Sequence, residues 1–313
     1  MKKVTRRAFF GTSLMAAAAM SVPETIPLGN AKPKIHKPEG YSAESPGIID
    51  TNINLFDWPF RNLKYRDADS LTTKLRKHGV KQAWAGSFEA LFHKDIQGVN
   101  ARLSEACKTH GKNFLLPFGT VNLGWPDWEE DLRICDEVHH MPGIRIYPSY
   151  QTFDLDHPDF PRLVQLTTQR GMILQIVGDM DDSRNHHPIV LARGVNMEPL
   201  IEIAKRETNA RLQLLYWNHR VNNKLLEKMV RETNIYFDTC RIETSGGIGR
   251  MIDGNPWSGP TLPFPVERLL FGSHAPYFPV EANILKLFES PLDLNQAKAI
   301  MEENVQTLIK HGK

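Results

Sequence analysis

Three polar side chains stand two positions apart in the stretch IIDTNINL, residues 48–55: Asp50, Asn52 and Asn54. Residues two apart along a strand point to the same face, so these side chains would form one polar row. An amide offers a metal only a neutral carbonyl oxygen, but it both donates and accepts hydrogen bonds. The row is therefore suited to hold a polar substrate. Whether this row also binds a metal depends on the ligands that the facing strands supply.

Eight short apolar or β-branched runs must position this row, and each is followed by a longer stretch with helical spacing. The runs are residues 48–55, 80–87, 113–122, 143–150, 172–178, 211–217, 235–241 and 268–276. Eight such pairs without a solenoid-length repeat predict a single-domain α/β fold, the (β/α)8 TIM barrel. A doubly wound open sheet is the alternative, but no glycine-rich turn after the first run supports a dinucleotide site.

The chain of 313 residues divides into three parts by composition. Arg6 and Arg7 precede an apolar run that is too short to span a bilayer, so we interpret residues 1–30 as a twin-arginine export signal. The mature protein is then expected to be exported and periplasmic, whereas a disordered basic tail is the alternative. Residues 31–46 are rich in Pro and Lys and are expected to be a linker, with the barrel in residues 47–313.

Composition narrows the classes of partner. Lys and Arg number 38 against 36 Asp and Glu, and part of the small positive excess lies in the leader. The mature barrel is therefore close to neutral, which argues against a nucleic-acid partner, and it lacks an apolar stretch for a membrane. Cys107, Cys135 and Cys240 form no CxxC pair, so we expect buried thiols rather than disulfides or a zinc knot.

In a TIM barrel the chemistry lies at the C-terminal ends of the strands and in the loops that follow them. At these ends the sequence places Asp50, Asn52, Asn54, Arg145, Gln151, Gln175, Asp238, Arg241 and His274. The loop GDMDDSRNHHP, residues 178–188, adds Arg184 and His187. Such a polar mouth predicts a small-molecule substrate, and exposed aromatic turns beside it leave room for a homo-oligomer.

Four stretches resemble the amidohydrolase-related family, metal-dependent hydrolases of TIM-barrel fold, over nearly all of residues 47–310. IIDTNINL is similar to the family's opening strand and GIRIYPSY, residues 143–150, to its fourth. ERLLFGSHAP, residues 267–276, is similar to the closing strand, and AIMEENVQTLIK, residues 299–310, to the C-terminal helix. The resemblance implies a hydrolase of a small amide, ester, lactone or carboxylate, in a branch with an atypical metal site.

The family's usual metal ligands are altered in this sequence. Asn52 and Asn54 stand where the resemblance implies two histidines, Gln175 matches a third histidine, and His274 replaces an aspartate. The sixth-strand histidine falls on Tyr216 or Trp217. Zinc prefers imidazole, thiolate and carboxylate ligands, so we expect no metal at the usual zinc site.

A divalent metal elsewhere is an alternative, because the loop after the fifth run is rich in hard oxygen and imidazole groups. Its candidate ligands are Asp179, Asp181, Asp182, His186 and His187. A solvated turn or a helix N-cap has the same composition.

His274 is predicted to be the general base, since an unperturbed histidine titrates near neutrality. Asp238 would assist the proton transfer, and Arg145 would hold the negative charge of the substrate. The predicted substrate-binding residues are Asn52, Asn54, Gln151, Gln175, Arg184, His187 and Arg241. The simpler interpretations are a structural ion pair for Asp238 and a loop hydrogen bond for His274.

Three functions agree with these residues: a hydrolase, a decarboxylase or lyase of the same family, and a catalytically inactive, exported ligand-binding barrel. The sequence does not separate the first two, because both need the same mouth. Metal analysis and a binding screen would separate the enzymes from the third.

Replacing both Arg6 and Arg7 by Lys should keep the protein in the cytoplasm, because twin-arginine export depends on that pair. Cell fractionation and immunoblotting measure the outcome. Export that continues unchanged in the double variant would contradict the signal assignment.

Overall fold

The computed structural model describes residues 47–310 apart from 183, 185, 191, 219–220 and 255–261. The predicted export signal and linker lie outside these residues. Within the described residues, no helix has both the length and the apolar composition needed to cross a membrane.

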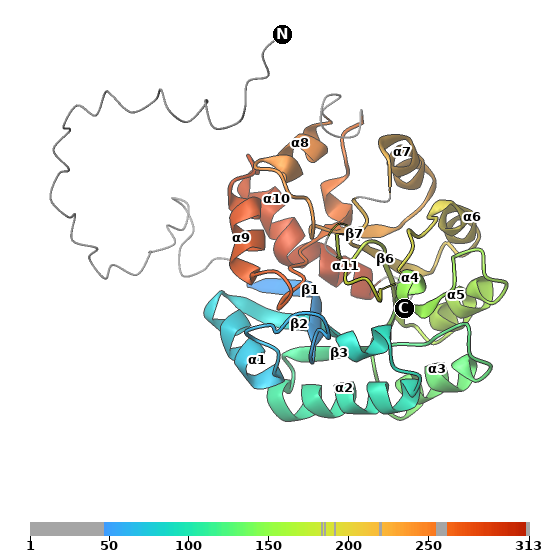
Figure 1. The fold of residues 1–313 in the computed structure, drawn as a ribbon. Coiled ribbons are helices and arrows are strands. Elements are labelled where there is room, and N and C mark those ends of the chain that lie inside the picture. Colours follow the sequence, from blue (N-terminus) through green and yellow to red (C-terminus); the bar gives the residue numbers. More distant parts are fainter. Residues whose placement is uncertain are drawn as a thin grey trace, which may run out of the picture. The chain divides into compact units, whose positions relative to one another are not determined.

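A cylinder of parallel strands forms the centre of the fold, and helices surround it (Figure 1). The strands lie side by side in sequence order as β1 (Ile48–Leu55), β2 (Val80–Ser87), β3 (Leu115–Gly119), β4 (Gly143–Ile146), β5 (Ile173–Val177), β6 (Arg211–Leu215), β7 (Tyr236–Asp238) and β8 (Leu269–Leu270). This order confirms the predicted α/β fold, a (β/α)8 TIM barrel.

The barrel closes between β1 and the chain that continues from β8. The amide of Thr51 donates to the Phe271 carbonyl at 2.9 Å, and the amide of His274 donates to the Asn52 carbonyl at 2.8 Å. Because these bonds join the last strand to the first, the sheet has no long unpaired edge there.

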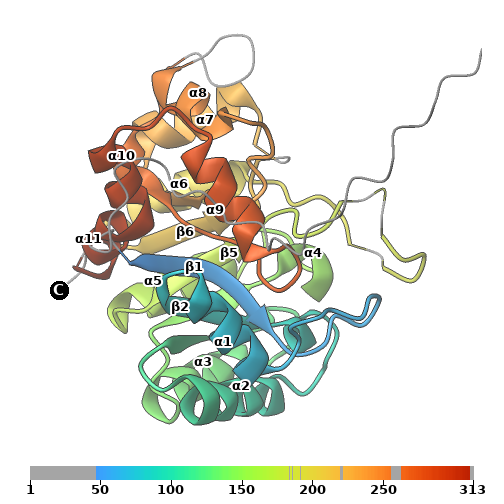
Figure 2. The same cartoon turned by 90° about the vertical axis from the view of Figure 1, so that its left-hand side faces the viewer.

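The outer layer consists of α1 (Ala68–Lys77), α2 (Ile96–Gly111), α3 (Trp128–Glu137), α4 (Pro148–Gln151), α5 (Phe160–Gln169), α6 (Glu198–Arg206), α7 (Asn223–Glu232), α8 (Gly247–Asp253), α9 (Val280–Phe288), α10 (Leu294–Lys298) and α11 (Asn304–Lys310). Side-chain caps start several of them: Asp67 accepts from the Ser70 amide, and Asn222 accepts from the Leu225 amide. Figure 2 shows α11 at one end of the barrel, with α4 and the long loops at the other.

Several strands are shorter than the predicted runs, because the backbone leaves the extended region where the polar residues begin. Tyr216, Arg241 and His274 have φ of +53°, +62° and +58°. Left-handed backbone is costly for residues with a Cβ and is concentrated at functional sites. The ends of the predicted runs therefore form turns that aim side chains at the barrel mouth.

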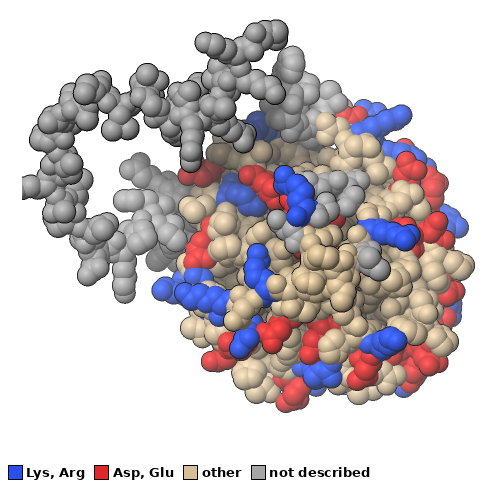
Figure 3. Space-filling model, viewed as in Figure 1, with Lys and Arg blue, Asp and Glu red and all other residues tan. Residues whose placement is uncertain are grey.

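Apolar side chains fill the end of the barrel opposite the long loops, where Trp84 stacks on Phe118 with ring centres 4.8 Å apart. Cys107, Cys135 and Cys240 are buried and free, as the sequence predicted. On the face drawn in Figure 3, basic and acidic groups are interspersed around the edge and form no stripe of one sign.

Candidate active site

The polar row on β1 depends on an irregularity in that strand. Asp50 pairs with Ala83 and Ile53 with Ala85, so three steps on β1 match two on β2. A bulge of this kind re-aims side chains. As a result Thr51 also reaches across the barrel, where its Oγ1 accepts a 2.7 Å hydrogen bond from Gln213.

Arg145 on β4 is fully buried inside the barrel, and each of its five N–H groups meets a protein oxygen. The acceptors are Gln175 Oε1 at 2.8 Å, the Ile53 carbonyl at 2.7 Å, Asn54 Oδ1 at 3.1 Å, the Trp84 carbonyl at 3.2 Å and the Thr51 carbonyl at 3.4 Å. No N–H group is left for a substrate anion, which corrects the expected role of Arg145 as a clamp. It positions other residues instead.

Gln175 belongs to the same inner layer. Its Nε2 donates to the Thr51 carbonyl at 2.9 Å and to Gln213 Oε1 at 2.8 Å, while its Oε1 faces Arg145. With all of these groups committed to protein partners, Gln175 supports the site from below rather than contacting substrate.

A second chain of hydrogen bonds lies between this layer and the mouth. Asn52 Nδ2 donates to Asp238 Oδ2 at 2.7 Å, and Asn52 Oδ1 accepts from the Tyr216 hydroxyl at 2.6 Å. The same hydroxyl oxygen accepts from Asn54 Nδ2 at 3.2 Å and lies 2.9 Å from His274 Nδ1. The chain thus links Asp238 on β7 to His274 after β8.

The directions of these bonds assign the tautomer of His274. An amide oxygen only accepts, so the Tyr216 proton points to Asn52, and a proton on His274 Nδ1 bonds the Tyr216 oxygen at 2.9 Å. Asn54 Nδ2 also lies 3.4 Å from this nitrogen, but it donates to the nearer Tyr216 oxygen at 3.2 Å. Nε2 then carries the lone pair. It is buried and has no partner within hydrogen-bonding geometry among the described residues, although the Met180 backbone lies near enough to raise the pKa of the ring.

Burial sets the acidity of the groups in this chain. It raises the pKa of Asp238 to about 7, although hydrogen bonds from Asn52 and the Tyr216 amide oppose the shift. The pKa of Asp50 also rises to about 7, mainly by burial. Burial lowers the pKa of His274 well below 6.5, and the nearby Arg241 lowers it further against an opposing effect of the Met180 backbone. The expectation of a histidine titrating near neutrality was therefore wrong.

Aromatic rings cover His274 on the solvent side. Tyr277 stacks on it with centres 4.6 Å apart, and Phe88 and Phe278 approach it edge-on. A cavity of about 500 Å³ lies against Phe88 and the loop after β1. Phe88 separates this cavity from the His274 ring, so entry from there requires that ring to turn.

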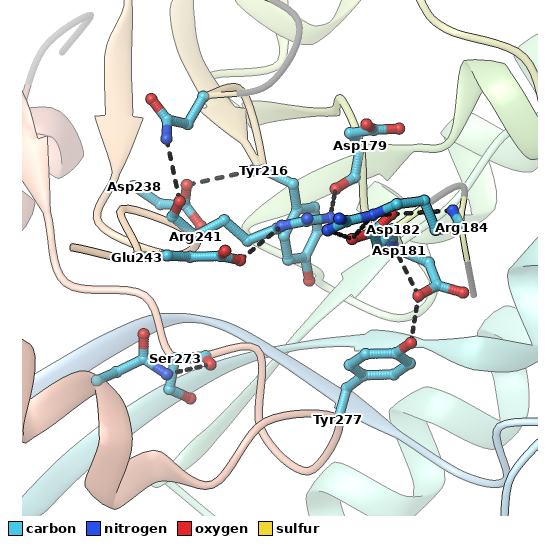
Figure 4. A network of polar contacts seen from close by, with 12 residues as sticks. Asp179, Asp181, Asp182, Arg184, Tyr216, Asp238, Arg241, Glu243, Ser273 and Tyr277 are labelled. Carbon is cyan, nitrogen blue, oxygen red and sulfur yellow. Dashed lines mark hydrogen bonds and ion pairs between the residues drawn. The ribbon is translucent and has the colours of Figure 1, made fainter. Parts of the chain in front are cut away.

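Arg241 lies at the mouth with its side chain only 4% exposed. Figure 4 shows it lying lengthwise between Glu243 and the Asp179 backbone, while the Tyr277 hydroxyl points to Asp181. Arg241 Nη1 donates to the Asp179 carbonyl at 2.8 Å. Its charge also lowers the pKa of His274.

Three other predicted binding residues lie apart from the hydrogen-bond chain. Gln151 donates to Thr120 and accepts from the Tyr147 amide, which fixes α4 in place. Arg184 is 86% exposed and pairs with Asp182, and His187 stacks on Phe60 at the rim. The structure therefore brings Asn52, Asn54, Asp238 and His274 together, but not these residues.

The donor set does not suit a transition metal. Asn54 and Gln175 turn their carbonyl oxygens to the Arg145 guanidinium, and that cation would repel a second one. The Asn52 oxygen is already bound by Tyr216. In the described part of the chain, no three His, Cys, Asp or Glu side chains group as metal ligands, and this includes the described residues of the 178–188 loop.

Comparison with known proteins finds solved structures that share this barrel fold. A candidate amidohydrolase from Staphylococcus aureus has 12% identity and a TM-score of 0.63, with 84% of this chain and 99% of that chain covered. A 2,6-dihydroxybenzoate decarboxylase from Rhizobium has 14% identity and a TM-score of 0.58, with 83% and 99% covered. A 5-carboxyvanillate decarboxylase from Novosphingobium aromaticivorans, bound to manganese and a nitrobenzoic acid, has 14% identity and a TM-score of 0.57, with 85% and 96% covered.

The chain has the barrel fold of these proteins. At 12 to 14% identity the likeness shows the fold, and that fold is the one implied by the resemblance to the amidohydrolase-related family. No family model matches the chain, and no curated protein matches it in sequence. These comparisons therefore do not assign an activity to the chain.

Sequence reasoning missed two glycines that the site requires. A Cβ on Gly86 would lie 2.6 Å from Arg145 Nη1 and from the Tyr147 hydroxyl. A Cβ on Gly272 would lie 2.9 Å from Asp238 Oδ2. Gly86 in AWAGS and Gly272 in LLFGS both stand near strand ends, where a glycine can indicate the close approach of another group.

Protein purified without added metal should contain far less than one zinc or manganese per chain, because Asn54 and Gln175 turn their oxygens to the Arg145 guanidinium and Tyr216 binds the Asn52 oxygen. Elemental analysis measures the content, and a chelator should leave the thermal midpoint unchanged. One tightly held metal ion per chain, with a lower midpoint after its removal, would contradict the assignment.

Gly86→Ala should lower the free energy of unfolding by about 1–3 kcal/mol, because the new methyl group would crowd Arg145. Denaturant titration measures the change. Gly124→Ala is the control, since its Cβ meets only the Asn122 side chain at 3.2 Å, and it should alter stability by no more than about 1 kcal/mol. Equal effects of both variants would argue against a crowded site.

Proposed function

We propose that this protein is an enzyme that removes CO₂ from a small hydroxylated aromatic acid, with Asp238 as the proton donor. Asp238 carries the proposal, because it is fully buried beside Asn52 and Tyr216 and its pKa is raised to about 7. A carboxyl group with that pKa is substantially protonated at neutral pH and can give up its proton.

The walls of the mouth suit a flat ring. Trp58 contacts both Phe88 and Tyr277 edge-on, and these two rings in turn contact His274. The adjoining cavity of about 500 Å³ falls in the size range of small-molecule sites, and of the three rings only Phe88 lines it. Asp238 and His274 do not line this cavity, so a substrate that enters through it has to pass Phe88. Aromatic side chains favour stacked or edge-on contacts with another ring, so an aromatic substrate fits better than an extended peptide.

His274 supplies the acceptor for a substrate hydroxyl. Its Nε2 carries a lone pair, is buried and lacks a partner among the described residues. A hydroxyl next to the reacting carbon would donate to this nitrogen and so fix the ring in one orientation.

The proposed step uses this chain's own groups. Asp238 gives its proton to the ring carbon that bears the carboxylate, and the bond from that carbon to the carboxyl group breaks. The carboxyl group leaves as CO₂, and its bonding electrons remain on the ring. Asp238, now a carboxylate held by Asn52, regains a proton from water.

Two of the similar structures support this reaction class, because their names give decarboxylation of 2,6-dihydroxybenzoate and of 5-carboxyvanillate. Hydrolysis of an amide, ester or lactone has less support. It needs a base that activates water, and the lowered pKa of His274 makes that ring a weak one.

Ligand binding without catalysis is the second candidate function. One observation favours it. The side chains of Arg145, Gln175 and Gln213 form a chain of hydrogen bonds with one another and with Thr51 on β1, as polar groups do in a structural core. Such a barrel would bind aromatic acids and release them unchanged.

Asp238→Asn should lower kcat/KM for decarboxylation by about 10²- to 10⁴-fold, because the variant has no acidic proton. Screening hydroxybenzoates for CO₂ release identifies the substrate for this measurement. In the wild type, kcat/KM should be level below the Asp238 pKa of about 7 and fall above it, as the acid form is lost.

Asp50→Asn is the matched control, since Asp50 is equally buried and has a similarly raised pKa. Its Oδ1 accepts from the Ser273 and Asn52 backbone amides and takes no part in the side-chain hydrogen bonds that join Asn52, Tyr216 and His274, so turnover should persist. Activity that disappears in Asp50→Asn but not in Asp238→Asn would show that Asp50, and not Asp238, donates the proton. Binding of hydroxybenzoates without any CO₂ release would favour the second candidate.

A further inference from the structure

Three buried nitrogen atoms at the mouth have no hydrogen-bond partner among the described residues: Arg241 Nε, His186 Nε2 and His274 Nε2. An unsatisfied buried polar atom costs free energy, so each needs an explanation. The atom on His274 is accounted for by the substrate hydroxyl proposed above. The other two are not used by that reaction.

Both atoms lie beside the segment that follows β5. Arg241 Nη1 donates to the Asp179 carbonyl at 2.8 Å, and His186 Nε2 lies 3.9 Å from Asp181 Oδ2. The Tyr277 hydroxyl also donates to Asp181, while the Tyr277 ring stacks on His274 (Figure 4). Asp181 thus links His186 to Tyr277, whose ring covers His274, and Arg241 bonds the same segment two residues earlier.

The positive charge of Arg241 is only partly matched. Its side chain is 4% exposed. Glu243 is 53% exposed and lies 3.4 Å from Nε without forming a hydrogen bond, and Asp182, whose pKa Arg241 helps to lower, pairs with Arg184. A buried guanidinium needs hydrogen-bonded counter-charge to offset its desolvation. Its left-handed backbone, with φ of +62°, adds a further cost. These costs indicate that the side chain is held in place for a ligand.

We propose that Arg241 and His186 form an anion subsite that receives the carboxylate of the aromatic acid. This inference rests on the proposed function and adds to it the residue that recognises the acid group. Guanidinium groups match carboxylates in geometry and charge. Glu243 shares the guanidinium, and this limits how tightly the carboxylate is held before it leaves.

Access to this subsite requires the segment after β5 to move, since the Arg241 and His186 nitrogens are shielded from solvent. Residues 178–197 contain no strand or α-helix in their described part. Contacts with Arg241, Tyr277 and the Phe60 ring hold its described residues Asp179, Asp181 and His187 in place. An incoming carboxylate would replace the contacts that Arg241 and His186 make with it.

Calorimetric titration with benzoate tests the subsite, with uncharged benzamide as the matched ligand. Arg241→Gln should weaken benzoate binding by at least about tenfold, the value of a charge-assisted hydrogen bond, and should leave benzamide unaffected. Arg250→Gln is the control, because Arg250 bonds the Thr244 hydroxyl on the exposed surface. It should bind benzoate as the wild type does.

Glu243→Gln gives a test with the opposite sign. Removing the competing carboxylate should strengthen benzoate binding by roughly two- to fivefold, as expected for loss of a weak ion pair. If Arg241→Gln does not fold, this variant and Arg241→Lys carry the test, and Arg241→Lys should also bind benzoate more weakly.

Failure of the subsite and failure of the proposed function are distinguishable. Equal benzoate binding by wild type and Arg241→Gln, weaker binding by Glu243→Gln, or no benzoate binding by the wild type at millimolar concentration would overturn the subsite. Binding that depends on Arg241, in a protein that releases no CO₂, would overturn only the decarboxylase.

Discussion

The buried guanidinium of Arg145 is the constraint on which the rest of the site depends. A cation inside a barrel is tolerated only if every N–H group finds an acceptor, and here the acceptors come from β1, β2 and β5. This requirement explains the amides at Asn54 and Gln175. An amide oxygen satisfies a guanidinium, whereas a protonated imidazole or a metal ion in the same place would add to the positive charge.

A side-chain amide has a donor end and an acceptor end, so the orientation that Arg145 imposes on Asn54 also determines which group Asn54 offers toward the mouth. Asn54 turns its oxygen to Arg145, so its nitrogen must face Tyr216. Asn52 turns its nitrogen to the Asp238 carboxyl group, so its oxygen must receive the Tyr216 proton. These two choices leave Tyr216 as an acceptor for His274, and the tautomer of that ring follows. A single buried cation thus helps to fix where the lone pair at the mouth points.

The sequence was sufficient for the fold, but not for the roles of the polar residues at the strand ends. Eight apolar runs and the amides Asn52 and Asn54 could be identified because strand periodicity is local. The role of Arg145 could not, because its acceptors lie on three strands far apart in the chain. Tyr216 was recognised only as a substituted ligand, since its left-handed backbone is not visible in LLYW. The exposure of Arg184 depends on loop conformation, which composition does not define.

The two buried carboxyl groups are what favours chemistry over a purely structural barrel. Burial raises the pKa of Asp50 and Asp238 from 3.8 to about 7. Between these values the folded chain holds protons that the unfolded chain has released, so stability falls as pH rises through that window. Asparagine at position 238 would avoid this pH-dependent loss, but its NH2 group would face either Asn52 Nδ2 or the Tyr216 amide, and both of these are donors. Use of the proton gives the raised pKa of Asp238 a purpose, since this carboxyl group is linked to the mouth through Asn52 and Tyr216.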